Sequence, residues 1–196
     1  MNRRGRILAL GALLWAAAGA PACRGDAPTG DAGVVTAAVE ARVATRANAA
    51  LKPLKQGLMQ ALKGALASGS PADAVAVCRD RAPAIAAAAA TDGVLVGRTS
   101  DRLRNPKNAP RAWVAPILAE YVAAAPSQRP PHRVVALPDG RFGYVEPIYT
   151  APLCTTCHGA QLAPAISAKL AALYPDDQAR DYAEGDLRGL FWAELP

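Results

Sequence analysis

The segment Cys154-Thr155-Thr156-Cys157-His158 brings two thiols and an imidazole within five consecutive positions. This C-x-x-C-H pattern is typical of c-type haem attachment. Each S–H can add across one vinyl group of the porphyrin, and two intervening residues allow both sulfurs to reach the same edge. His158 follows directly and is placed to bring an imidazole nitrogen to the iron. The motif therefore predicts one covalently attached haem c, held by Cys154 and Cys157, with His158 as an iron ligand.

Two other uses of a C-x-x-C pair compete with haem attachment. A thioredoxin-like redox pair usually lies at a strand-to-helix turn of a βαβ unit, and the sequence upstream shows no such unit. A zinc site would need His132 or Cys78 as a further ligand, and the adjacent Cys157 and His158 rarely face one ion together. We favour haem over both and keep a thiol-disulfide oxidoreductase as a less favoured function.

The N-terminus has the parts of an export signal. Three arginines within the first six residues precede the uncharged apolar run 7–20, which is shorter than the roughly 20 residues of a membrane-spanning helix. Small residues follow, and Cys23 comes directly after them. We predict a signal peptide over 1–22 and a periplasmic or otherwise exported protein. Lipidation of Cys23 would anchor it to a membrane, and ordinary cleavage that leaves Cys23 unmodified is the alternative.

The rest of the chain is expected to form one domain. Residues 23–33 are rich in Gly, Asp, Pro and Ala, which predicts a flexible tether. Residues 34–196 suffice for a single haem domain, and 52% of the whole chain is apolar, so a core can form.

The net charge of +6 does not indicate a nucleic-acid partner. Three of the 22 Lys and Arg residues lie within 1–22, which holds no Asp or Glu, so the remainder has 19 basic and 16 acidic residues and a charge of +3. Aromatic and basic residues are not interleaved, and no nucleic-acid recognition motif is present. We expect no binding to nucleic acid.

Apolar spacing and turn residues predict an α/β chain of the α+β type. Leucines at helical spacing indicate a helix over 34–67, which Pro53 would split or kink. Ser70, Pro71 and Asp73 can begin a second helix through a capping box. Further helices are expected over 109–125 and 160–173, and strands over 94–96, 133–137 and 142–149 (a hairpin with the preceding one), with 185–195 as an edge strand.

The second axial position of the iron has three candidate ligands outside the motif. His132 stands at the start of a strand, where a lone histidine is usually a surface residue. Met59 adjoins the leucine stripe and is more typical of a core filler. Cys78 lies on the inward face of its helix, just before the bend expected at Pro83, and an idle thiol would oxidise in an exported compartment. We rank Cys78 first by a narrow margin, with a buried structural cysteine as the alternative.

Several separated stretches occur in an order that carries a family resemblance. They are residues 76–78 with 82–86, residues 97–100 with 103–110 and Trp113, then 154–159, 174–177 and 185–189. From about Lys55 onward the chain resembles a family of small exported c-type haem domains with a PAS-like fold, found alone or as sensor modules of membrane-bound kinases and chemoreceptors.

The resemblance implies a PAS-like antiparallel sheet flanked by helices, with an N-terminal helical segment. It also implies iron ligation by His and Cys, and the matching positions are His158 and Cys78. The chain departs from the family pattern at Phe191-Trp192, which replace a less bulky continuation. It contains no kinase or receptor segment, so we expect signalling to pass through a separate partner.

These features favour a redox or gas sensor, with a simple electron-transfer cytochrome as the alternative. Thiolate ligation stabilises ferric iron, and loss of the Cys78 bond on reduction would open a site for CO or NO. No paired distal acid–base residues are recognisable, so we expect no enzymatic activity. Arg98, Arg102 and Arg104 can pair with haem propionates, although a solvated basic loop is slightly favoured. Expected partners are haem, a redox or signalling protein, and a membrane only through a lipid at Cys23.

Overall fold

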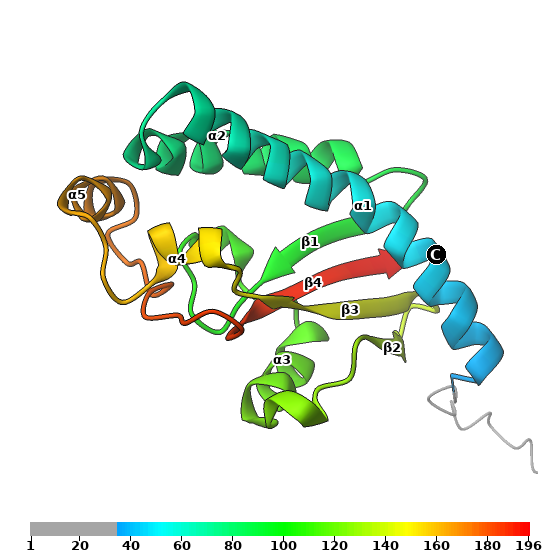
Figure 1. Ribbon diagram of the computed structural model, residues 1–196. Helices are drawn as coiled ribbons and strands as arrows, with labels where there is room; N and C mark the ends of the chain where they lie inside the picture. The colour runs from blue at the N-terminus through cyan, green and yellow to red at the C-terminus, as the bar shows by residue number, and fades with distance from the viewer. Residues whose placement is uncertain (1–34) are drawn as a thin grey trace, which may run out of the picture. The chain divides into compact units, whose positions relative to one another are not determined.

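A computed structural model describes residues 35–196, whose centre is a four-stranded antiparallel sheet (Figure 1). The predicted signal peptide 1–22, the tether 23–33 and Cys23 lie outside the described residues. The sheet order is β1-β4-β3-β2. The strands are β1 (Leu95–Thr99), β2 (Arg133–Ala136), β3 (Phe142–Tyr149) and β4 (Leu187–Leu195).

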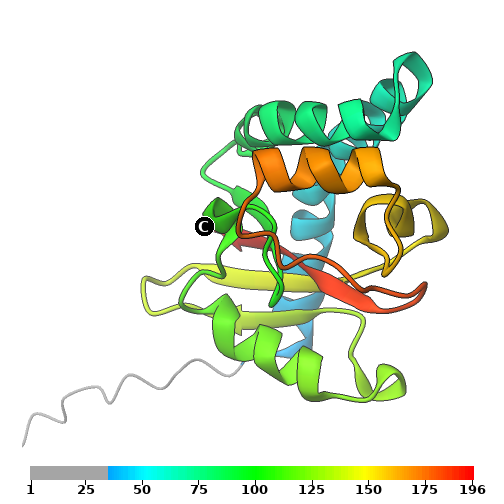
Figure 2. The same cartoon turned by 90° about the vertical axis from the view of Figure 1, so that its left-hand side faces the viewer.

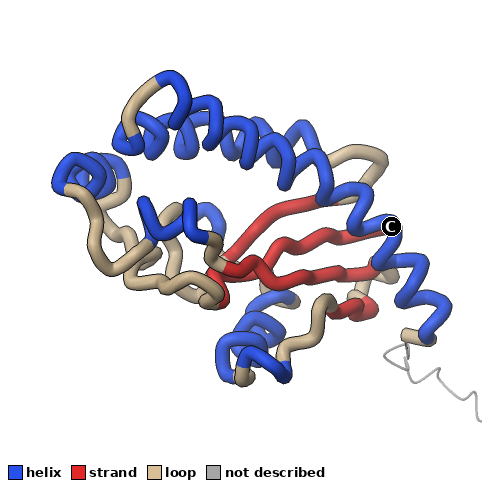
Figure 3. Tube along the Cα trace, in the orientation of Figure 1, coloured by secondary structure: helices blue, strands red, loops and turns tan. Residues whose placement is uncertain are grey.

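The long helix α1 (Ala37–Ser68) packs on one face of the sheet (Figure 3). Thr36 caps it by accepting a hydrogen bond from the Val39 N–H. Its buried residues Leu51 and Leu54 belong to the same apolar cluster as Tyr144 of β3. Pro53 does not split the helix, because the buried leucines on both sides hold the chain against the sheet.

The second helix, α2 (Pro71–Ala89), begins as the sequence predicts. The Ser70 hydroxyl accepts from the Asp73 N–H, and the Asp73 carboxylate accepts from the Ser70 N–H, which completes a capping box. Only Ala74, Val75 and Ala89 of this helix are fully buried. α2 packs on α1 and α5, and because its three fully buried residues are small, it buries little apolar side-chain area.

The remaining helices lie on the other face and at one end of the sheet. The helix α3 (Val114–Ala123) begins later than expected and covers the opposite face, where Ile117 and Leu118 meet Val145 and Leu190. The short helix α4 (Pro152–His158) was not predicted. The other helices are α5 (Pro164–Leu173) and the 3-10 turns Pro106–Asn108 and Pro126–Gln128. Within 35–196 no helix combines the length and apolarity needed to cross a bilayer.

The prediction that 185–195 forms an edge strand is wrong. β4 lies between β1 and β3, with Ala193 opposite both Val96 and Tyr144. Helices cover both faces of the sheet, so residues on both faces of β4 are buried, as Leu190 and Ala193 illustrate. The predicted β2–β3 hairpin is confirmed, as is the arrangement of an antiparallel sheet flanked by helices with a helical segment at its N-terminal side.

Candidate haem site

The C-x-x-C-H segment forms α4, at the end of the sheet where β3 finishes (Figures 1 and 2). Pro152 stands at the start of the helix, and the Gly159 N–H ends it by donating to the Thr155 carbonyl at 2.8 Å. Cys154 and Cys157 are three positions apart on a helix and therefore share one side. Both are free, partly buried thiols, so their sulfurs can reach the same edge of a planar ligand.

The imidazole of His158 is held by a backbone carbonyl. Its Nδ1 lies 2.8 Å from the Ala179 oxygen, which can only accept, so Nδ1 carries the proton and Nε2 keeps a free lone pair. Burial, followed by the charges of Arg188 and Arg104, lowers the pKa of His158 to about 3. The neutral, iron-binding form of the ring is therefore the one present at neutral pH.

Arg104 links α4 to the segment that contains Ala179. Its Nε lies 3.0 Å from an Asp177 oxygen, and its Nη2 donates to the carbonyls of Cys157 at 2.6 Å and Ala179 at 3.1 Å. Burial acts to raise the pKa of Asp177, but hydrogen bonds from Arg104, the Ala179 N–H and Arg180 bring it below its ordinary value. Arg104 is therefore engaged within the protein, so the favoured expectation of a solvated basic loop is wrong for this residue.

Tyr182 also contacts His158, through both its backbone and its ring. Its N–H donates to the His158 carbonyl at 2.9 Å, and the two rings meet edge to face with centroids 6.4 Å apart. The guanidinium of Arg102 lies 3.7 Å from the centre of the Tyr182 ring, and that of Arg188 lies 4.9 Å away. Tyr182 and Arg188 were not singled out from the sequence, although Arg188 falls within the matching stretch 185–189.

Cys78 reaches the site from α2, which contacts both α4 and α5. Cys157 packs against a cluster that includes Val75, one helical turn before Cys78. The two thiols are close enough for the charge of Cys78 to contribute, after burial, to the raised pKa of Cys157. Burial also raises the pKa of Cys78, against the opposing charges of Arg98 and Arg104. The fold thus brings Cys78 into the neighbourhood of the motif.

The candidate ligand His132 is not brought into this group. The Nε2 of His132 lies 3.4 Å from a Glu40 oxygen, and its ring stacks on Tyr144 at 5.6 Å. These contacts tie His132 to the first turn of α1 rather than to α4.

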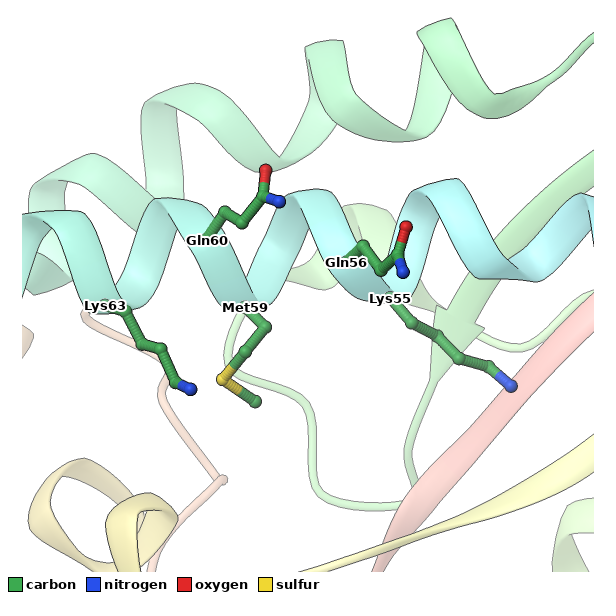
Figure 4. Close-up of a pocket in the computed structure, with 5 residues that line it drawn as sticks. All are labelled: Lys55, Gln56, Met59, Gln60 and Lys63. Atoms are coloured by element: carbon green, nitrogen blue, oxygen red, sulfur yellow. The ribbon is translucent and has the colours of Figure 1, made fainter.

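The expectation that Met59 fills the core is wrong, since 44% of it is exposed. It lies one turn beyond Lys55, which pairs with Glu146 of β3. The buried face of α1 continues through Ala61 and Ala65, and Met59 lies off that face, so its thioether lines a surface pocket with lysines and glutamines (Figure 4).

The donor set suits a covalently attached haem. Two unpaired thiols on one helix side and a neutral imidazole with a free Nε2 are the groups that attach such a cofactor, and a nearby third thiol can supply a second iron ligand. Apolar side chains near α4 are also left uncovered, with Leu153 39% and Tyr149 43% exposed. Within the described part of the chain, no cluster of three or more His, Cys, Asp or Glu side chains forms a metal-ion site.

Comparisons with known proteins find one matching family model and one matching solved structure. A family model described as Tll0287-like matches residues 33–196, a range that includes Cys78 and the whole C-x-x-C-H motif. Among solved structures, the crystal structure of the cyanobacterial haem protein Tll0287 matches with 25% sequence identity and a TM-score of 0.54, covering 82% of this chain and 96% of that chain. A comparison with curated proteins finds no match.

Proposed function

This chain belongs to the Tll0287-like family, and from that membership we propose that it is an exported c-type haem protein that senses redox state or a small gas. The similar structure is that of a haem protein, which supports haem as the cofactor here. The observation that carries the proposal is the gathering of Cys154, Cys157, His158 and Cys78 around α4. In this proposal the first two attach one haem and the last two hold its iron.

Each residue of the group has a distinct task. The haem supplies a ferric/ferrous couple when bound. The Ala179 carbonyl keeps the proton of His158 on Nδ1, so that Nε2 is always available. Cys78 is a neutral thiol without metal, because burial raises its pKa, and coordination would remove its proton. Arg98 and Arg104 favour the resulting thiolate.

The weak attachment of α2 favours sensing over simple electron transfer. A carrier benefits from ligands that stay fixed in both oxidation states, whereas a sensor needs an element that moves. Only three of the 19 residues of α2 are fully buried, and Pro83 lies in this helix five residues after Cys78. A small shift of the helix that carries Cys78 therefore costs little packing energy. The alternative remains an electron-transfer cytochrome in which Cys78 stays bound.

Spectroscopy of the haem-loaded protein tests the ligand assignment. We expect a low-spin, thiolate-type ferric EPR spectrum in the wild type and its loss in Cys78→Ser. His132→Asn serves as a matched control, because His132 contacts Glu40 and Tyr144. Met59→Leu should also leave the spectrum unchanged. A Cys78→Ser protein whose ferric absorption and EPR spectra equal those of the wild type would exclude Cys78 as a ligand.

Carbon monoxide separates the sensor from the carrier. If reduction releases Cys78, the ferrous wild type should bind CO readily and show a shifted absorption spectrum. If the protein is a carrier, CO should leave the ferrous spectrum unchanged until the sixth ligand is removed by Cys78→Ser. The second outcome would reject sensing while keeping the haem assignment.

A thiol-disulfide oxidoreductase is the less favoured alternative. Such enzymes rely on a thiol whose pKa is lowered, whereas burial raises the pKa of Cys157. We propose no enzymatic activity for the chain. Export, and a lipid at Cys23, rest on the N-terminal sequence; Cys23→Ser should release the protein from a membrane fraction if the lipid is present.

A further inference from the structure

Five arginines surround α4 and the segment that supports His158, but they are not equally engaged. Arg104 and Arg180 both pair with Asp177. Arg102 donates to the Arg180 carbonyl at 2.8 Å and stacks on Tyr182. Within residues 35–196, Arg98, Arg102 and Arg188 have no carboxylate within ion-pair distance, and of these only Arg102 donates to a backbone carbonyl.

Arg98 and Arg188 come from adjacent strands at the end of the sheet next to α4 (Figure 1). Arg98 is the fourth residue of the five in β1 and lies opposite Phe191, which packs on the α1 side of the sheet. Arg98 therefore shares the face that α1 and α2 cover. Arg188 is the second residue of β4.

A β-bulge directs Arg188 toward the site. Ile148 pairs with Gly189 and Tyr149 pairs with Leu187, so Arg188 is the extra residue between two paired ones. Gly189 makes the bulge with φ of 148°, and a Cβ there would overlap the Thr99 carbonyl oxygen. The displaced Arg188 side chain stacks on Tyr182 and donates to the Ser100 hydroxyl at 3.0 Å.

The positive charges of Arg98 and Arg188 are destabilising in this environment, because no carboxylate in the part of the chain that the structure describes pairs with them. Burial, with neighbouring arginines adding to it, lowers the pKa of both Arg98 and Arg188. Arginine nevertheless remains protonated in proteins, so the protein keeps two partly buried cations. A buried cation is tolerated when an anion pairs with it, and the planar guanidinium matches a carboxylate best.

We infer that Arg98 and Arg188 bind the two propionate carboxylates of the haem attached at α4. The inference rests on the proposed function and adds to it the residues that receive the acidic edge of the porphyrin. It changes the set of arginines considered from the sequence. Arg98 is kept and Arg188 is added, whereas Arg102 and Arg104 are left out because they bind other groups of the protein.

The test is resonance Raman spectroscopy of the haem-loaded protein, in which the propionate-bending band reports hydrogen bonding to those carboxylates. We expect Arg98→Gln and Arg188→Gln each to shift this band and to lower the midpoint potential, because a positive charge near the iron is lost. Arg98→Lys and Arg188→Lys, which keep the charge and guard against misfolding, should shift the band but restore most of the potential. Arg102→Gln removes the same charge beside the same Tyr182 ring and should leave the band in place.

Three results would overturn the inference. The first is an unchanged propionate band in both Arg→Gln variants with haem attached, which would leave the proposed function intact. The second is a midpoint potential that depends on added phosphate at constant ionic strength, since the arginines would then bind a free anion. The third is the absence of covalent haem in a pyridine haemochrome assay, which would reject the proposed function as well.

Discussion

At the scale of the residue, the site depends on contacts with the backbone that cannot be recognised in the sequence. Cys154, Cys157 and His158 are recognisable because their spacing in the chain is itself the signal. The partner of His158 is the carbonyl of Ala179, which any amino acid at that position could provide. Arg188 was not predicted for a related reason, since its proposed role in binding a propionate follows from a bulge and not from its neighbours in the chain.

Arg104→Gln should lower the free energy of unfolding by roughly 2–4 kcal/mol, because buried Asp177 loses its main cationic partner. The change also removes the donor to the carbonyls of Cys157 and Ala179. Urea unfolding followed by circular dichroism measures it, with Arg79→Gln, whose partner Asp80 is exposed, as the control. Equal, small effects in both variants would show that Arg104 is not a structural link.

Acid should weaken the same contact. The pKa of Asp177 is lower in the folded protein than its ordinary 3.8, so the unfolded state takes up a proton first as the pH falls. The stability contributed by Asp177 is therefore complete above that value and is lost as the pH drops through the folded pKa. We expect Asp177→Asn to show a shallower loss of stability below pH 4 than the wild type in urea titrations. Parallel slopes would contradict this account.

At the scale of the element, the sequence predicts those features that local patterns encode. The capping box of α2 and the β2–β3 hairpin are confirmed because each depends on residues a few positions apart. The helix α4 was missed because seven residues are too few to show helical periodicity. The central place of β4 was missed because strand order depends on contacts with β1, roughly 90 residues earlier.

The pairing of β1 with β4 depends on a close approach between Gly97 and Trp192. They are directly opposite in the ladder, and a Cβ at Gly97 would overlap the Trp192 ring. We expect Gly97→Ala to reduce stability by about 1–3 kcal/mol, as overpacking does. Gly64→Ala, in α1 with open space around it, should instead stabilise by up to about 1 kcal/mol in the same unfolding assay. A neutral Gly97→Ala would show that the Trp192 ring can shift aside at no cost.

At the scale of the whole molecule, the fold joins a firmly packed half to a lightly packed one. The sheet, α1 and α3 enclose the large buried side chains, among them Leu51, Leu54, Tyr121 and Tyr144. The cluster that joins α2 to α4 and α5 has only Val75, Ile166 and Leu170 as fully buried members. The family resemblance noted in the sequence is confirmed. The candidate ligands Cys78 and His158 lie on α2 and α4, in the lightly packed half.

If Cys78 leaves the iron on reduction, α2 should become more dynamic. Hydrogen–deuterium exchange of the haem-loaded protein should then be faster in 71–89 for the ferrous than for the ferric form, with α1 unchanged. In Cys78→Ser the two oxidation states should exchange alike. Equal exchange in the wild type would favour the electron-transfer alternative.

The most direct test of the central claim is the intact mass of the chain, produced with haem-attachment machinery and read together with a pyridine haemochrome spectrum. We predict that the mass exceeds that of the polypeptide by one haem, that the haemochrome is of the c type, and that Cys154→Ser with Cys157→Ser abolishes both. A polypeptide of unmodified mass, with Cys154 and Cys157 free or joined in a disulfide, would contradict the account.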